Sequence, residues 1–166
     1  MPADSAAGGR PETGQPAPDF TLPTTGGGTL RLSALRPRSV VLYFYPKDDT
    51  PGCTTQATDF TARHADFDAL GAQVLGVSRD SLASHERFRE KHALAIPLLS
   101  DEDGTVCRAY GVWVEKTNYG RRYMGIERST FLIDGKGVLR RIWRNVRAKG
   151  HADEVLTALR ELSGQG

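Results

Sequence analysis

Hydrophobic and polar residues recur along the chain with the periods of strands and helices. Residues 39–45 form a continuous run of β-branched and aromatic side chains, which is typical of a strand buried on both faces of a sheet. Pro46 ends this run, and after a polar turn Thr50 and Pro51 provide a helix N-cap and a proline suited to the first helical position. Side chains at helical spacing then predict a helix that continues up to Gly71: Phe60, His64, Phe67 and Leu70.

The same order of elements repeats further along the chain. Residues 72–78 predict a second strand and residues 81–92 a second helix, so the pattern becomes strand, helix, strand, helix. This pattern favours parallel strands joined by right-handed crossovers. The remaining predicted elements are an N-terminal hairpin (20–22 and 29–32), a short strand (97–100), a short helix around 106–110, a hairpin (130–133 and 138–143) and a closing amphipathic helix (151–162).

Composition and charge limit what this domain can be. Residues 1–15 are small and polar, so we expect a flexible tail followed by a single domain over residues 16–166. A net charge of +2 gives no field that would draw the whole protein to nucleic acid or to an acidic membrane. The longest apolar run, residues 40–45, is far shorter than the about 20 residues of a membrane-spanning helix. No secretory signal precedes the domain, and we expect a cytoplasmic protein.

The two cysteines, Cys53 and Cys107, lie too far apart for a CxxC redox pair or a four-ligand zinc site. Cys53 belongs to the first turn of the predicted helix that follows the central strand, and Thr50 lies one turn before it. A helix N-terminus favours the anionic form of a group, so the position predicts a nucleophilic thiolate with Pro46 shielding its pocket. A buried, inert cysteine is the alternative that the position alone leaves open.

The spacing Pro46-x-x-x-Thr50-x-x-Cys53 resembles the active-site signature of the peroxiredoxins, which are thiol peroxidases. Further matching stretches lie at residues 17–23, 43–47, 98–101, 110–113 and 128–134. Together they resemble the bacterioferritin-comigratory, or Q-type, branch of that family and span nearly all of the chain beyond the tail. The resemblance implies a thioredoxin-like α/β fold, with a central mixed sheet flanked by helices and an N-terminal β-hairpin.

The resemblance also implies roles for individual residues. Cys53 is expected to be the peroxidatic cysteine, Thr50 to hydrogen-bond the peroxide and Pro46 to cover the thiolate. Arg128 is expected to hold the sulfur as thiolate and to stabilise charge on the leaving oxygen, with Gln56 orienting the guanidinium. The implied reaction reduces hydrogen peroxide and organic hydroperoxides and leaves a Cys53 sulfenic acid, which a second thiol must reduce. No metal or organic cofactor is required for this antioxidant chemistry.

The chain departs from the family at the resolving cysteine. Many members of the branch have that cysteine where this chain has Thr58, and residues 81–92 contain no cysteine either. We therefore expect a one-cysteine cycle in which a small thiol or a thioredoxin-like protein is the external reductant. Cys107 is then a half-buried structural thiol, and the alternative is an atypical two-cysteine cycle in which Cys107 resolves the sulfenic acid.

A basic segment at residues 136–149 remains outside this interpretation. It carries several cations and no carboxylate: Lys136, Arg140, Arg141, Arg144, Arg147 and Lys149. We favour a strand with one solvated face followed by a basic loop, and the alternative is a non-catalytic thioredoxin-like module that binds nucleic acid or an acidic partner through this segment. The histidines lack the spacing of a metal site and are expected on the surface or on helix faces. The resemblance favours a monomer.

Overall fold

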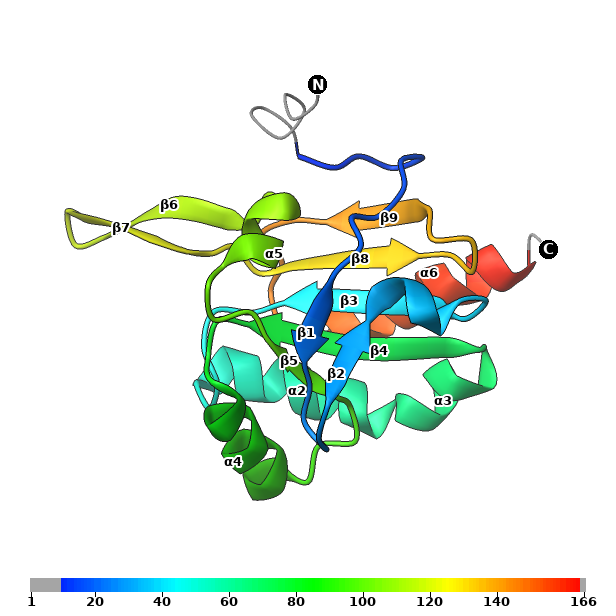
Figure 1. The fold of residues 1–166 in the computed structure, drawn as a ribbon, viewed down its shortest axis with the longest axis horizontal. Coiled ribbons are helices and arrows are strands. Elements are labelled where there is room, and N and C mark those ends of the chain that lie inside the picture. Colours follow the sequence, from blue (N-terminus) through cyan, green and yellow to red (C-terminus); the bar gives the residue numbers. More distant parts are fainter. Residues whose placement is uncertain (1–9, 165–166) are drawn as a thin grey trace.

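The computed structural model describes residues 10–164, and at its centre lies a five-stranded mixed sheet with the strand order β5-β4-β3-β8-β9 (Figure 1). β3 is parallel to β4 and β4 is parallel to β5, whereas β8 is antiparallel to both β3 and β9. The arrangement confirms the predicted α/β class, with parallel strands in its first half. The strands are β3 (Ser39–Phe44), β4 (Ala72–Ser78), β5 (Leu98–Ser100), β8 (Ser129–Ile133) and β9 (Leu139–Trp143).

β3 occupies the middle of the sheet because both of its faces are apolar, as predicted. Val41 and Tyr43 pack into one core, and Val40, Leu42 and Phe44 pack into a second core on the opposite face. The first core is covered by α2 (Pro51–Ala62), α3 (His64–Ala69), α4 (Leu82–His92) and α6 (His151–Gly164). The second is covered by β1 (Thr21–Pro23), β2 (Thr29–Arg31), the 3₁₀ helix η1 (Leu32–Leu35) and α5 (Thr105–Ala109). In Figure 1, β1 and β2 cross in front of the sheet and α6 lies behind it.

The helix predicted to continue up to Gly71 is in fact two helices, α2 and α3. Arg63 leaves the helical conformation between them, with φ −107° and ψ 12°. Its guanidinium donates to the carbonyl of Asp59 and to the carboxylate of Asp153 in α6, which holds the break against that helix. No helix within residues 10–164 is both long enough and apolar enough to cross a bilayer.

A second hairpin, β6 (Trp113–Asn118) and β7 (Arg121–Ile126), is missing from the sequence prediction. It projects from the body of the molecule beyond α5 (Figure 1). Tyr119 and Gly120 form its turn with φ values of 52° and 78°, and a two-residue hairpin turn of type I′ requires positive φ at both positions. Most of its side chains are exposed, so the hairpin lacks the apolar alternation that reveals a strand in a sequence.

The N-terminal arm runs along β9 before it reaches β1. Gly14 donates its N–H to the Leu139 carbonyl (2.8 Å), and Leu139 donates in return to Gln15 (2.9 Å). Residues 1–9, which make up most of the predicted tail, lie outside the described residues.

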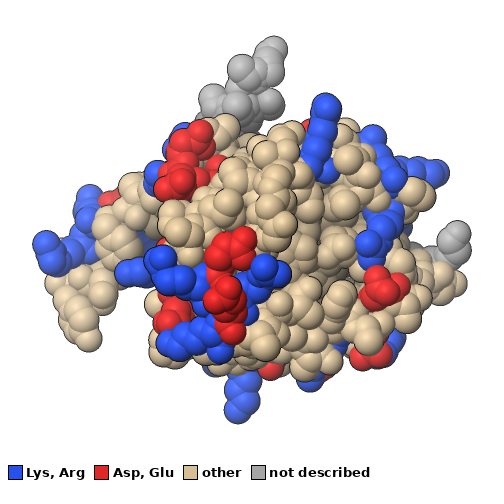
Figure 2. Space-filling model, turned by 60° about the horizontal axis from the view of Figure 1, so that its bottom comes forward, with Lys and Arg blue, Asp and Glu red and all other residues tan. Residues whose placement is uncertain are grey.

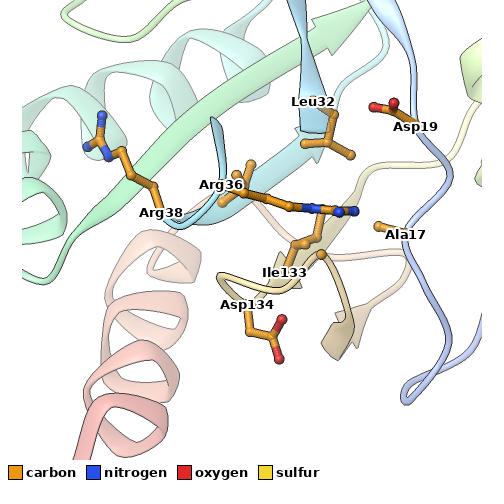
Figure 3. A pocket seen from close by; sticks show the side chains of 9 residues that line it. Ala17, Asp19, Leu32, Arg36, Arg38, Ile133 and Asp134 are labelled. Atoms are coloured by element: carbon orange, nitrogen blue, oxygen red, sulfur yellow. The ribbon is translucent and has the colours of Figure 1, made fainter. Parts of the chain in front are cut away.

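A hollow of about 10 Å³ lies beside this arm. Figure 3 shows the Arg36 side chain extending between Leu32 and Ile133 toward Ala17. Gly137 packs directly against the guanidinium, where any Cβ would collide with it. The hollow has room for about one water, so we interpret it as a packing feature and not as a ligand site.

Candidate active site

Cys53 lies in the first turn of α2, just beyond the end of β3, where the sequence predicts it. Its side chain is 1% exposed. Thr50 precedes the helix in an extended conformation, and its carbonyl accepts the N–H of Thr54 (2.8 Å). The Thr50 hydroxyl donates to the Lys47 carbonyl (2.9 Å) and makes no helix-capping hydrogen bond. Thr50 therefore occupies the N-cap position while its hydroxyl stabilises the preceding loop.

Arg128 reaches Cys53 from the residue before β8. The pairing of β8 with β3 brings Ser129 alongside the last residue of β3, and this pairing delivers Arg128 to the start of α2. Its Nη2 donates to Cys53 Sγ (3.4 Å), and its Nη1 donates to Gln56 Oε1 (2.7 Å). Gly52 leaves room for the guanidinium, since a Cβ there would lie 3.1 Å from Nη2. A permanently charged donor next to sulfur stabilises the thiolate form.

Gln56 joins this group from the next turn of α2 and is completely buried. Its carbonyl oxygen accepts from Arg128, and its Nε2 has no hydrogen-bond partner among the described residues. The structure thus brings the predicted residues Cys53, Gln56 and Arg128 together in one hydrogen-bonded group. The guanidinium is held at both ends of its fork, which limits its orientation at the sulfur.

Tyr43 of β3 is a neighbour of Cys53 that the sequence analysis does not single out. Its ring stacks on Phe60 with 4.8 Å between centroids, and a Cβ at Gly76 would lie 2.9 Å from its hydroxyl. Burial, followed by the electrostatic effect of the nearby Cys53, raises the pKa of Tyr43, so the hydroxyl stays protonated at neutral pH. The Tyr43 side chain near the Cys53 sulfur is therefore uncharged, and its hydroxyl does not take a proton from the Cys53 thiol.

Pro46 lies near the start of the loop that leads from β3 to α2. Together with Thr50 it is half-buried in the segment between β3 and α2. Pro46 lines a groove of about 350 Å³ that separates this loop from the β6–β7 hairpin, a volume within the range of small-molecule sites. The other lining residues are Arg79, Glu102, Trp113, Lys116, Tyr123, Met124, Gly125 and Ile126.

A buried polar network supports the same loop from inside. The Asp48 carboxylate accepts from the hydroxyls of Tyr45 (2.6 Å) and Ser84 (2.8 Å) and lies 2.7 Å from His85 Nδ1. His85 Nε2 lies 2.9 Å from the Leu99 carbonyl, so this nitrogen carries a proton. The network joins the active-site loop to α4 and β5. Nothing in the sequence links His85 to Asp48, so this network is not predicted by the expectation that the histidines lie on the surface or on helix faces.

The candidate ligand atoms of Asp48, Asp80 and His85 lie within 4.8 Å of one another. All three side chains are already engaged in hydrogen bonds. Asp80 accepts from the Ser78 hydroxyl (2.6 Å) and from the Asp48 N–H (2.9 Å), in addition to the contacts of Asp48 and His85 described above. We therefore interpret this cluster as a structural network and not as a metal centre.

Cys107 lies on the other side of the sheet from Cys53. It is 0% exposed within the second core, whereas Cys53 belongs to the first core. Burial, followed by contact with Asp101, raises the pKa of the Cys107 thiol. The Asp101 carboxylate also accepts the Cys107 N–H (2.8 Å) and so caps α5. The half-buried position predicted for Cys107 is wrong, because both Val106 and Cys107 of this short helix face the core.

The basic segment at residues 136–149 contributes several contacts to the fold itself. Arg144 is half-buried and donates to the Tyr110 carbonyl (3.4 Å), and Arg140 pairs with Asp134 (3.3 Å). Arg141 is exposed on β9, next to the exposed Arg140, so the exposed side chains do not alternate along this strand as a single solvated face requires. Only part of the positive charge of this segment is therefore free for other partners.

Comparison with known proteins shows which proteins this chain is similar to. The model of the AhpC/TSA family matches residues 13–142. The putative peroxiredoxin Bcp of Coxiella burnetii is 50% identical over 148 residues, which cover 89% of this chain and 98% of that protein. Peroxiredoxin Bcp of Bacillus subtilis is 49% identical over 152 residues, covering 92% and 97%. A solved structure of the Xanthomonas campestris bacterioferritin comigratory protein, studied for its alkyl peroxide reduction activity, superposes with a TM-score of 0.86 at 46% identity, covering 92% and 99% of the two chains.

Proposed function

This chain belongs to the AhpC/TSA family and is a thiol-dependent peroxidase of the Bcp (PrxQ) branch, with the thioredoxin fold of that family, and we propose that Cys53 is its single redox-active cysteine. The observation that carries this proposal is the position of the two thiols. Cys53 and Cys107 belong to cores on opposite faces of the five-stranded sheet. A disulfide requires Cα atoms within about 7 Å, and a sheet packed on both faces keeps such residues further apart.

In the proposed reaction, the Cys53 thiolate attacks the terminal oxygen of the hydroperoxide. The O–O bond breaks, water or an alcohol leaves, and the sulfur becomes a sulfenic acid. Arg128 stabilises the thiolate and the charge that develops on the leaving oxygen, in line with its donation to Cys53 Sγ, and Gln56 holds the guanidinium in place. Thr50 accepts a hydrogen bond from the peroxide, since its own hydroxyl proton is donated to Lys47. Pro46 shields the thiolate.

We propose hydrogen peroxide and organic hydroperoxides as substrates. The relative from Xanthomonas campestris is described by its alkyl peroxide reduction activity. The groove beside Pro46 has apolar walls from Trp113, Met124 and Ile126, which suit the organic part of an alkyl hydroperoxide. The Cys53 sulfur supplies both electrons to the O–O bond and two equivalents of external thiol return them, so the scheme contains no metal or organic cofactor.

The cycle closes with an external reductant, a small thiol or a thioredoxin-like protein. Thr58, the position of the resolving cysteine in many relatives, donates its hydroxyl to the Thr54 carbonyl (2.9 Å) within α2 and has no redox chemistry. We propose a monomer that acts in the cytoplasm, where thiols are kept reduced.

The test is intact-mass analysis after one equivalent of hydrogen peroxide, with and without a sulfenic-acid trap. We expect a trapped adduct on Cys53 in the wild type and in Cys107→Ser, and none in Cys53→Ser. A wild type that loses two hydrogen atoms, with this loss absent from Cys107→Ser, would make Cys107 the resolving thiol. The absence of any adduct would refute the proposed role of Cys53.

A further inference from the structure

The loop between β3 and α2 contains a tight turn that determines where the Thr50 side chain lies. The Thr50 hydroxyl donates to the Lys47 carbonyl (2.9 Å), and the two residues between them, Asp48 and Asp49, form the centre of the turn. The conformation of these two residues therefore decides the position of the Thr50 oxygen. In the proposed reaction this oxygen accepts a hydrogen bond from the peroxide.

Asp49 has a backbone conformation that few side chains adopt. Its φ is 58°, in the left-handed region, and Asp49 is the third of the four residues of the turn. A positive φ at this position is the mark of a type II turn, where glycine or asparagine is usual. Aspartate is one of the few other residues that tolerate this region, because its short polar side chain can form local hydrogen bonds. Such a conformation persists only when surrounding contacts hold it.

The carboxylate of Asp49 makes those contacts with the last turn of α4. It accepts a hydrogen bond from Lys91 Nζ (2.7 Å) and lies 3.0 Å from His92 Nε2. The His92 ring packs edge-on against the buried Phe88 ring, with 5.4 Å between centroids, so the imidazole is itself held in place. Lys91 and then His92 lower the pKa of the Asp49 carboxyl, which is therefore ionised at neutral pH.

Asp48 connects the same turn to α4 from the interior of the protein. Its carboxylate contacts Ser84 and His85 of that helix. Its N–H donates to the carboxylate of Asp80, two residues before the helix begins (2.9 Å). Both central residues of the turn are thus bound to one element, Asp48 through buried contacts and Asp49 through contacts near the surface.

The pair that Asp49 makes differs from the other ion pairs of α4 in what it constrains. Figure 2 brings forward the side of the molecule on which α4 lies, and acidic and basic side chains lie next to one another there. Glu86 and Arg89, for example, pair within the helix (3.0 Å). Exposed pairs of this kind add little to global stability. The effect of the Asp49 pair is therefore expected in the turn to which it is attached.

From these contacts we propose that Asp49 is a positioning residue for the reaction with peroxide. Its carboxylate, bound to the C-terminal end of α4, keeps the turn in the conformation that places the Thr50 oxygen for its hydrogen bond with the peroxide. The inference rests on the proposed role of Thr50 and identifies the group that acts through it. No bond forms or breaks at Asp49.

The experiment compares two reagents that react with the same sulfur. Hydrogen peroxide uses the hydrogen bond to Thr50 in the proposed reaction, whereas iodoacetamide alkylates the thiolate and has no O–O group. Competition with a second peroxidase gives the first rate constant, and mass spectrometry of the alkylated Cys53 peptide gives the second. In Asp49→Ala we expect the constant for peroxide to fall about tenfold, since a small misplacement of a substrate-binding group is costly, and the constant for iodoacetamide to change less than about twofold.

Asp49→Asn should recover most of the peroxide rate. Asparagine also adopts the left-handed conformation, and its side-chain carbonyl still accepts a hydrogen bond from Lys91. Asp68→Ala is the matched control, because it removes an exposed carboxylate that pairs with Arg38 (3.0 Å) on α3, in another part of the fold. Both rate constants of this control are expected to equal those of the wild type.

Thr50→Val tests the role on which the inference rests, and we expect it to lose peroxide rate selectively. A wild-type peroxide rate in Asp49→Ala, or equal losses with both reagents, would overturn the inference, while a selective loss in Thr50→Val would leave the proposed function standing. A wild-type peroxide rate in Thr50→Val would refute the proposed role of Thr50, and the inference with it.

Discussion

The Arg128 guanidinium joins the reacting sulfur to the side chain that orients it. One nitrogen donates to Cys53 and the other to Gln56. A lysine at this position keeps the charge but has no planar fork to make both contacts. We therefore expect Arg128→Lys to lower kcat/KM for hydrogen peroxide about a hundredfold, the usual cost of losing a fixed donor at a developing charge. Competition with a second peroxidase for limiting peroxide measures this constant.

The Gln56 contact permits a graded control for that prediction. Gln56→Ala leaves the Arg128 charge in place and removes only the group that orients it, so a smaller loss of about tenfold is expected. Thermal unfolding of each variant separates loss of structure from loss of reactivity. If Arg128→Lys retained the wild-type rate, charge alone would be sufficient and the geometric role of the fork would be wrong.

At the scale of elements, the buried network ties the active-site loop to α4. Removing one partner of a buried charged or hydrogen-bonded pair leaves the other without compensation, whereas replacing both by apolar groups removes that cost. We expect Asp48→Ala to lower the free energy of unfolding by about 3–5 kcal/mol, because Tyr45, Ser84 and His85 all lose the acceptor they share. The double variant Asp48→Ala with His85→Leu should recover part of this loss. Urea denaturation of both variants tests this, and strictly additive losses in the double-mutant cycle would contradict the coupling.

The start of α6 gives the fold a dependence on pH. Burial lowers the pKa of His151 below its usual 6.5, although Glu154 acts in the opposite direction. The unfolded chain regains the ordinary value, so below about pH 6.5 it binds a proton that the folded state resists, and the free energy of unfolding falls as the pH drops. Between about pH 7.5 and about pH 5.5, this decrease should be smaller in His151→Gln than in the wild type. Urea denaturation at both pH values measures the difference, and equal decreases would contradict the assignment to His151.

The elements that the sequence predicts correctly are those whose signal is local. The apolar run of β3, the Thr50-Pro51 helix start and the spacing of Cys53 and Gln56 on one helix are all read within a few residues. The β6–β7 hairpin escapes prediction because its exposed strands carry little apolar alternation and its turn is Tyr119-Gly120, without the usual Asn-Gly signal.

Contacts between residues that are far apart in the chain cannot be predicted from local sequence patterns. Asp48 and His85 are brought together only by the crossover that makes β3 and β4 parallel, and no local pattern connects them. The contact of Arg128 with Cys53 joins residues even further apart in the chain, and only the family resemblance led to its prediction. The groove that contains Lys116 combines segments from four parts of the sequence, so it becomes visible only in the folded chain.

At the scale of the whole molecule, the central sheet determines which thiols can meet. Cys53 and Cys107 lie in separate cores on its two faces, and burial keeps the Cys107 thiol protonated by raising its pKa. Opening α2 alone exposes Cys53 but leaves Cys107 buried, because Cys107 belongs to α5 and faces the second core. We therefore predict that a protein oxidised at Cys53 under native conditions forms no Cys53–Cys107 disulfide until the sheet itself unfolds.

The measurement is a urea series on the oxidised protein, in which the disulfide appears as a further loss of water in the intact mass. Its midpoint should coincide with the loss of far-ultraviolet circular dichroism, because both report global unfolding. Cys107→Ser, which lacks the second thiol, should show the same unfolding midpoint within the small effect of the substitution and no loss of water. A disulfide that forms well below the unfolding transition would mean that local motion carries one thiol past the sheet. In that case Cys107 could act as the resolving thiol, and the proposed one-cysteine cycle would be wrong.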